Sequence, residues 1–177
     1  NLSIEEHFLF TAVAANSIII CLKNYIKENI YIKWPNDIIV NDSKIAGIMT
    51  EIVEKNNIKY IIIGIGINIF SSPKITNYKT CCLNDYTSNL KYEDILFYMI
   101  QSYFEEYQMI LDNKYNTIID KFKNKMPHLD SKINILLPNG EIKNLLLKNI
   151  NYDGSLLVEK EGIEENIFSA RIINDIY

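Results

Sequence analysis

One run of apolar residues at helical spacing, followed at once by four short β-rich runs, constrains the fold most strongly. Apolar side chains recur at three- and four-residue intervals over residues 4–28, which predicts one long helix packed into a core. Strands are predicted over residues 30–33, 37–40, 44–53 and 60–69, with turn-forming residues between them. Strands this close together pair with their neighbours, so we expect a mixed, largely antiparallel sheet packed on helices.

The hydrophobic pattern changes after Pro127. Before it, helical spacing predicts two more helices, over residues 92–111 and 113–125. After it, short strands are predicted over residues 132–137, 142–150, 156–160 and 166–173. The expected fold class is therefore α+β (α/β), with a first domain over residues 1–128 and a small C-terminal SH3-like β-barrel over residues 131–177.

Composition and charge exclude several classes of function. The net charge is −4 and no block of five or more Lys or Arg occurs, which argues against a nucleic-acid groove. The three cysteines include no C-x-x-C pair and the two histidines lie far apart, so no zinc site is expected. Sparse cysteines, the absence of a signal peptide and apolar runs too short to span a bilayer favour the cytoplasm.

The first segment that suggests chemistry is Lys-Trp-Pro-Asn-Asp at residues 33–37. Pro35 cannot donate to a strand ladder, so the strand must break there. The break directs Lys33, Asn36 and Asp37 toward one end of the sheet. Taken alone, the segment is more readily explained by Trp34 filling the edge of the core beside a turn.

Two further segments carry glycine within predicted strands. Gly47 leaves space in mid-strand, and Lys44 at the start of that strand can reach an anion or simply be an exposed turn lysine. Gly64 and Gly66 alternate on one strand face, which makes a flat floor for a flat ligand or a tightly packed central strand. Asn68 follows them and offers both a donor and an acceptor. The pattern is neither a dinucleotide fingerprint nor a P-loop.

Together and in this order, KWPNDIIVNDSKIAGIMTE followed by IIIGIGIN resembles the biotin–protein ligases (biotin–[acetyl-CoA-carboxylase] ligases). The preceding helix and the following β-domain also fit, so the resemblance covers nearly the whole chain. It implies an enzyme that joins biotin to ATP, giving biotinyl-5′-AMP and pyrophosphate, with Mg²⁺. It also implies transfer of biotin to a lysine of a biotin carboxyl carrier protein of acetyl-CoA carboxylase or a related carboxylase.

The resemblance assigns expected roles to residues of this sequence. Lys44 should bind the biotin carboxylate and then the α-phosphate, and Lys33 should be a second cation toward the phosphates, so these two are the expected catalytic residues. The expected biotin-binding residues are Lys44, Gly47, Ile48, Gly64 and Gly66. The expected ATP-binding residues are Lys33, Trp34, Asn36, Asp37 and Asn68, of which Asp37 and Asn68 are also the expected Mg²⁺ ligands.

Residues 70–89 stand where the family has its adenylate-binding loop, and we expect this loop to be mobile until it orders over the adenylate. The candidates for packing on adenine are Phe70, Tyr78, Leu83 and Tyr86. The family's Gly/Arg-rich loop, a G-R-G-R-x-G-R pattern upstream of the long helix, is absent, and Arg171 is the only arginine. We therefore expect a further segment to precede this sequence.

Three alternatives to the ligase remain open from the sequence. The first is a non-catalytic remnant that binds biotin or an adenylate. The second is a lipoate–protein ligase of the same superfamily, which the pairing of KWPND with GIGIN disfavours. The third is an RNA-binding module in the C-terminal β-domain, which the acidic balance disfavours. By analogy with relatives, a homodimer formed through the sheet is also expected.

Overall fold

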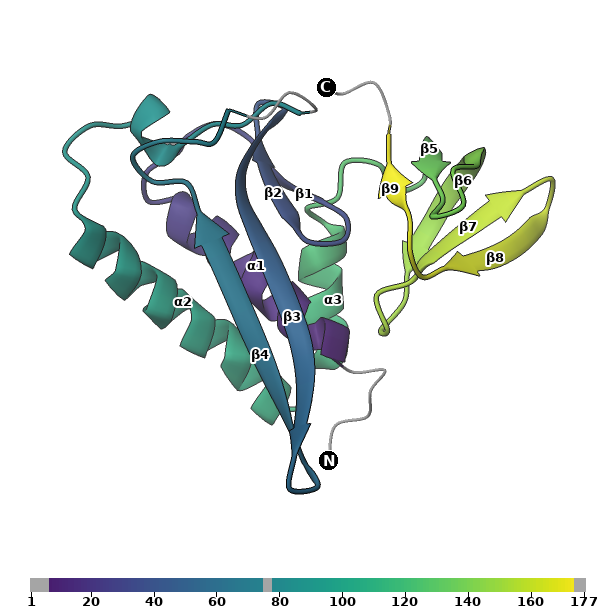
Figure 1. The fold of residues 1–177 in the computed structure, drawn as a ribbon, viewed down its shortest axis with the longest axis horizontal. Helices are drawn as coiled ribbons and strands as arrows, with labels where there is room; N and C mark the ends of the chain where they lie inside the picture. Colours follow the sequence, from purple (N-terminus) through teal and green to yellow (C-terminus); the bar gives the residue numbers. More distant parts are fainter. Residues whose placement is uncertain (1–6, 75–77, 174–177) are drawn as a thin grey trace.

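A computed structural model describes residues 7–74 and 78–173, and within them two sheets and three α-helices are arranged as in Figure 1. The helices are α1 (Phe8–Leu22), α2 (Tyr92–Leu111) and α3 (Tyr115–Lys123). They cover one face of a four-stranded sheet of order β1-β2-β3-β4, made of β1 (Ile30–Lys33), β2 (Asp37–Val40), β3 (Ser43–Lys55) and β4 (Ile58–Ile67). All neighbours in this sheet are antiparallel, and one isolated parallel bridge joins Lys44 to Thr80. The expected α+β class is confirmed.

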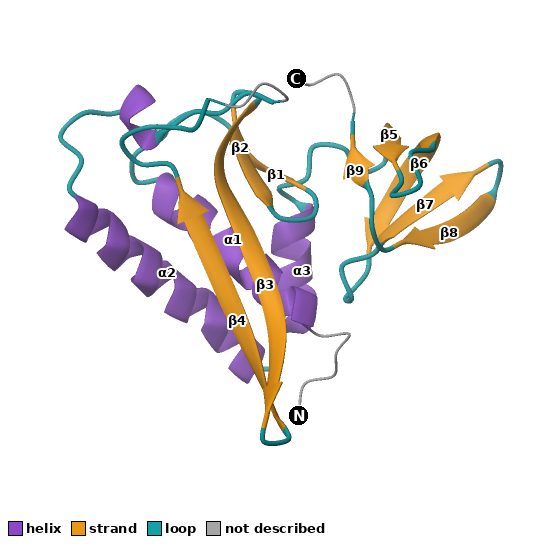
Figure 2. Ribbon diagram, viewed as in Figure 1, coloured by secondary structure: helices purple, strands orange, loops and turns teal. Residues whose placement is uncertain are grey.

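A second, five-stranded antiparallel sheet follows the helices (Figure 2). Its strands are β5 (Lys132–Leu136), β6 (Ile142–Ile150), β7 (Leu156–Lys160), β8 (Ile163–Ile167) and β9 (Arg171–Ile172), in the order β8-β7-β6-β5-β9. The prediction of a single strand over residues 166–173 is wrong. The first part of this segment belongs to β8, which pairs with β7, and the chain then crosses to form β9, which pairs with β5. The closure into an SH3-like barrel and the division at residues 128–131 stay predictions.

Helix α1 is the centre of the core. Every residue in it except Ile20 is buried, which is the pattern of a helix surrounded by protein on all sides. It ends at Leu22, six residues before the predicted end, in a tighter turn: the Asn24 N–H donates to the Cys21 carbonyl and the Tyr25 N–H to the Leu22 carbonyl, three residues back instead of four. Residues 4–6 of the predicted helix lie outside the described part. No helix in that part is long and apolar enough to cross a bilayer.

The three cysteines are free and buried. Burial raises the pKa of Cys21 to about 11 and also raises the pKa of Cys81 and Cys82. All three therefore remain protonated thiols near neutral pH, which makes them poor nucleophiles and poor metal ligands. Cys21 is part of the hydrophobic core.

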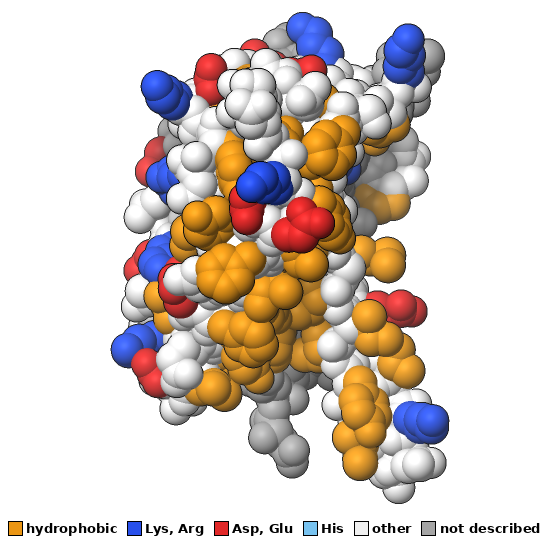
Figure 3. Space-filling model, turned by 90° about the vertical axis from the view of Figure 1, so that its left-hand side faces the viewer, with side chains coloured by type: hydrophobic (Ala, Val, Ile, Leu, Met, Phe, Trp, Pro, Cys, Tyr) orange, Lys and Arg blue, Asp and Glu red, His pale blue; other side chains and the backbone are white. Residues whose placement is uncertain are grey.

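One side of the molecule, formed by α2 and the edge strand β4, exposes many hydrophobic side chains (Figure 3). On α2 they are Tyr92, Leu96, Phe97, Tyr98, Ile100, Phe104 and Leu111. Further exposed apolar side chains lie on the open face of the β3–β4 ribbon, the face that carries Gly64: Met49, Val53, Tyr60 and Ile62. The outer edge of β4 has no strand partner within the described residues, so apolar side chains and unpaired backbone groups lie on the same side.

The two sheets are joined by a clamp between Trp34 and the β6–β7 turn. The indole N–H of Trp34 donates to the carbonyl oxygen of Gly154 at 2.8 Å, and Trp34 is 4% exposed. Gly154 has a φ of +83°, and a Cβ placed on it would lie 2.4 Å from Phe8 Cδ2. The turn therefore fits between Trp34 and Phe8 only because Gly154 has no side chain.

We expect Gly154→Ala to lower the free energy of unfolding by about 3 kcal/mol, of which about 1 comes from the left-handed backbone and about 2 from displacing the Phe8 ring. Gly140→Ala and Gly162→Ala are the matched controls, since both glycines have positive φ but open space around them. Each control should cost only about 1 kcal/mol. Urea unfolding measures all three, and equal losses would contradict the clamp.

Candidate active site

A β-bulge in β3 determines which side chains face the site. Asp37 pairs with Gly47 and Ile38 with Ala46, but Ile39 pairs with Lys44, so Ile45 is an extra residue in β3. Paired residues share a sheet face, and one extra residue reverses the alternation beyond it. Lys44 therefore lies on the same face as Gly47 and Asp37, whereas regular alternation would turn it toward the helices.

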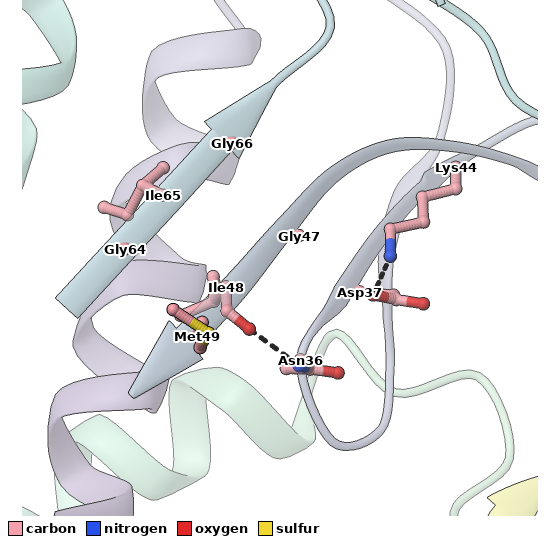
Figure 4. Close-up of a pocket in the computed structure, with 9 residues that line it drawn as sticks. All are labelled: Asn36, Asp37, Lys44, Gly47, Ile48, Met49, Gly64, Ile65 and Gly66. Carbon is pink, nitrogen blue, oxygen red and sulfur yellow. Dashed lines mark hydrogen bonds and ion pairs between the residues drawn. The ribbon is translucent and has the colours of Figure 1, made fainter. Parts of the chain in front are cut away.

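Lys44 and Asp37 form the central ion pair of the site. The Lys44 Nζ lies 2.5 Å from Asp37 Oδ1, and both side chains are partly exposed, at 26% and 29% (Figure 4). A Cβ on Gly47 would lie 3.2 Å from Lys44 Cε and Nζ. The lysine side chain thus crosses directly over Gly47, and a larger residue there would push the ammonium group away from the carboxylate.

The turn between β1 and β2 is fixed to β3 by two hydrogen bonds. The Asn36 Nδ2 donates to the Ile48 carbonyl at 2.6 Å, and the Ile48 N–H donates to the Asn36 carbonyl at 3.0 Å. The Trp34–Pro35 peptide within this turn is cis. These contacts hold Asn36 and Asp37 at the end of the sheet, as the break at Pro35 predicted.

A cavity of about 420 Å³ lies on the glycine-containing part of the sheet. Its lining residues are Asn36, Asp37, Lys44, Gly47, Ile48, Met49, Gly64, Ile65 and Gly66 (Figure 4). Added Cβ atoms on Gly64 and Gly66 would come no closer than 3.8 and 3.9 Å to other atoms, so protein packing does not require glycine there. The two glycines leave open space over this part of the sheet, and their role as a floor for a flat ligand stays a prediction.

A second cavity of about 330 Å³ adjoins the first and shares Asn36, Asp37 and Lys44 with it. It is further lined by Lys33, Trp34, Pro35, Tyr78, Ala170 and Arg171. Three cations and one carboxylate therefore line this space. Clustered cations suit a polyanion such as a chain of phosphates, so the two cavities combine a flat, open floor with a cationic compartment.

The neighbours of Lys33 perturb its charge. Burial lowers the pKa of Lys33 to about 8, Arg171 and Lys44 lower it as well, and Asp37 opposes them. Lys33 is therefore cationic at neutral pH and loses its proton as the pH rises through about 8. Burial and the charge of Lys33 also lower the pKa of His128, which keeps that imidazole neutral near pH 7.

Three predicted site residues are placed differently from the others. Asn68 lines neither cavity; its Nδ2 donates to the backbone carbonyls of Lys44 at 3.3 Å and Cys81 at 3.0 Å, so it braces the strand that carries Lys44. The Ile48 side chain is buried with the core, on the opposite face from Gly47. Trp34 lines the cationic cavity, but its indole N–H is engaged by Gly154, as the core-edge interpretation anticipated.

Six residues that line the cavities are not among the expected biotin- or ATP-binding residues: Pro35, Met49, Ile65, Tyr78, Ala170 and Arg171. Met49 pairs with Gly64 in the register of β3 with β4, so Met49 lies on the same sheet face as the glycines. Only knowledge of this pairing could have predicted its position. Tyr78 had been considered only for adenine; its ring centroid lies 5.7 Å from Lys44 Nζ. Arg171 lies far away in sequence and gave no local signal.

Part of the loop over residues 70–89 is held against the site; its residues 75–77 lie outside the described part. The Lys44 N–H donates to the Lys79 carbonyl at 2.9 Å, and the Cys81 N–H donates to the Lys44 carbonyl at 3.0 Å. A short 3₁₀ helix, η2 (Leu83–Asp85), follows. The expected ordering of this loop over an adenylate stays a prediction.

Part of the chain is similar in sequence to known proteins. The sequence profile of the Biotin/lipoate A/B protein ligase family matches residues 5–68. The bifunctional ligase/repressor BirA of Bacillus subtilis (strain 168) is 43% identical over 61 residues, which cover 34% of this chain and 16% of that protein. BirA of Escherichia coli (strain K12) is 23% identical over 140 residues, covering 77% of this chain and 43% of BirA. The chain thus spans less than half the length of these relatives.

Solved structures match over much more of the chain. The biotin protein ligase of Aquifex aeolicus has a TM-score of 0.79 at 19% identity, covering 97% of this chain and 77% of that one. The structure of the Aquifex aeolicus ligase in complex with biotin and ATP gives a TM-score of 0.74 at 20% identity, covering 94% of this chain and 70% of that one. Residues 5–68 therefore match the sequence profile of the Biotin/lipoate A/B protein ligase family, and the chain as a whole shares its fold with these solved structures.

We expect the environment of Lys33 to be testable by NMR titration of its side-chain ¹⁵Nζ, with a pKa of about 8 in the parent chain. Asp37→Asn should lower that pKa further, because it removes the opposing charge, and Arg171→Gln should raise it. Lys55, an exposed lysine at the end of β3, is the internal control and should not respond. A rise of the Lys33 pKa in Asp37→Asn, or a fall in Arg171→Gln, would contradict the site electrostatics.

Proposed function

We propose that this chain is a biotin–protein ligase that forms biotinyl-5′-AMP from biotin and ATP. The observation that carries the proposal is the junction of two cavities at Lys44 and Asp37. The glycine floor suits the planar ureido ring of biotin, and the compartment with Lys33 and Arg171 suits the phosphates of ATP. A bound biotin carboxylate and an ATP α-phosphate would then meet beside the Lys44 ammonium group.

In the first step, an oxygen of the biotin carboxylate attacks the α-phosphorus. A carboxylate-oxygen-to-phosphorus bond forms, the bond from the α-phosphorus to the bridging oxygen breaks, and pyrophosphate leaves with that electron pair. Lys44 would release Asp37, hold the carboxylate in line and then offset the negative charge that gathers on the α-phosphate. Lys33 would hold the outer phosphates while it is cationic, so this step should weaken as the pH rises through about 8.

Asp37 is the residue that would hold Mg²⁺, because its carboxylate lines both cavities. Within the described residues no cluster of three His, Cys, Asp or Glu side chains exists, so phosphate oxygens and water would complete the coordination. Bound Mg²⁺ neutralises part of the phosphate charge. Asn68, the second predicted ligand, lines neither cavity; only its amide oxygen could reach Mg²⁺, since the amide nitrogen donates to the Lys44 and Cys81 carbonyls.

In the second step, a lysine amine of a biotin carboxyl carrier protein attacks the acyl carbon of biotinyl-5′-AMP. An amide bond forms, the acyl–phosphate bond breaks, and AMP leaves.

The apolar side formed by α2 and β4 supports the proposed homodimer, since the edge of β4 has no strand partner within the described residues. Three buried, unpaired thiols fit the proposed location in the cytoplasm.

The deciding experiment is biotin-dependent exchange of pyrophosphate into ATP. The parent chain should exchange, and Lys44→Ala should lose at least about 100-fold in rate, the range typical of removing one charge-stabilising group. Lys55→Ala removes an equal charge far from the cavities and should exchange like the parent. If the 177-residue chain shows no exchange, the assay is repeated with upstream sequence added, and silence there would favour the non-catalytic remnant.

We expect Gly64→Val to weaken biotin binding by at least about tenfold, because its branched methyls enter the first cavity. The fold should persist, since the added Cβ meets only Met49 atoms at 3.8 Å. Ile62→Val on the same face of β4, outside the cavity, is the control. Calorimetry with biotin and with lipoate separates the two ligand classes; preference for lipoate would overturn the assignment to biotin.

A further inference from the structure

A third cavity, of about 330 Å³, lies between α1 and α3 and shares no lining residue with the two cavities of the site. Its walls come from the second half of α1 and from the end of α3 with the residues that follow. Asn16, which is 5% exposed, and Ile19, which is 2% exposed, lie at its buried side, and Ile20 is the one α1 residue that is exposed.

Three lysines line this cavity, and two of them lack a carboxylate partner. Lys121 pairs with the buried Glu106, whose Oε1 lies 2.6 Å from the Lys121 Nζ. Lys23 and Lys125 form no ion pair in the described part of the chain. Instead their side chains lie close enough to interact with each other, and both burial and Lys23 lower the pKa of Lys125. The fold thus places two like charges side by side without a counterion.

Helix ends do not account for these two lysines. A cation near a helix C-terminus is favourable, and α1 and α3 both end here. However, backbone N–H groups already bond the last carbonyls: Lys23 N to Ile19 O, Ile26 N to Leu22 O and Lys125 N to Phe122 O, at 2.9–3.0 Å. The ammonium groups are therefore not needed as caps and remain available to an anion.

We propose that this cavity binds a small aliphatic carboxylate, with its carboxylate between Lys23 and Lys125 and its hydrocarbon chain against Ile19 and Ile20. A counterion between the two ammonium groups would remove their repulsion, and the isoleucine wall would shelter the chain from water. The volume is at the lower end of small-molecule sites, which limits the ligand to a few carbons. The site is separate from the proposed ligase reaction.

A backbone hydrogen bond links the cavity to an amide group whose NMR signal can report ligand binding. The carbonyl oxygen of Lys125 accepts from the Ile32 N–H at 2.8 Å, and Ile32 lies in β1 immediately before Lys33. A ligand that draws Lys125 inward should therefore shift the Ile32 amide resonance together with those of the cavity wall.

The test is an amide NMR titration of the full chain with hexanoate and, as its uncharged match, hexan-1-ol. Hexanoate should cause saturable shifts at Ile19, Asn124 and Ile32, and hexan-1-ol should bind at least about tenfold more weakly, because it cannot satisfy the lysine pair. The double variant Lys23→Gln/Lys125→Gln should lose at least about tenfold in hexanoate affinity. Lys55→Gln/Lys59→Gln removes the same charge from the exposed β3–β4 ribbon and should bind like the parent.

The proposal is overturned by equal binding of hexan-1-ol, by unchanged affinity in the cavity double variant, or by the absence of saturable shifts. Lys23 and Lys125 are not fully buried, so the double variant should fold, and its thermal midpoint is measured first. If the glutamine pair disturbs folding, Lys23→Met/Lys125→Met keeps the apolar stems and serves in its place. None of these measurements depends on the exchange of pyrophosphate into ATP, so the two proposals are tested independently.

Discussion

The extra residue at Ile45 is the constraint on which the site depends. In a regular strand every second side chain shares a face, so Lys44 and Gly47, three positions apart, would lie on opposite faces. The bulge places both on the open face beside Asp37 while Ile45 and Ala46 are both buried. A single inserted residue thus lets a core strand present a cation without exposing its apolar neighbours to water.

The ion pair of Lys44 with Asp37 lies between two chemically different surfaces. Toward β4 the surface is glycine and backbone, and toward the β1–β2 turn it is lined with cations. The cationic side is completed by Arg171 from β9, and the Trp34–Gly154 hydrogen bond fixes the second sheet against that turn. Docking of the two sheets therefore also completes the charge distribution around the site.

The local charges oppose the charge of the whole chain. The chain carries a net charge of −4, yet three cations converge on one compartment and lower the pKa of Lys33 to about 8. Such crowding costs stability in the free protein and is relieved by an anion. The lysine pair between α1 and α3 shows the same feature on a smaller scale, away from the site.

The sequence by itself determined most of the elements, and it named most of the residues that the structure brings together around the two cavities. Periodicity gave the helices and strands, except where a tighter turn ended α1 early and the chain split the last predicted strand. The break at Pro35 and the glycines at positions 64 and 66 correctly indicated one end and one face of the sheet, because these depend on local backbone chemistry. Tertiary structure alone decided the position of Lys44, the engagement of Asn68 and Trp34, and the arrival of Arg171. Those features depend on strand register and on contacts between residues far apart in the chain, for which a local pattern carries no signal.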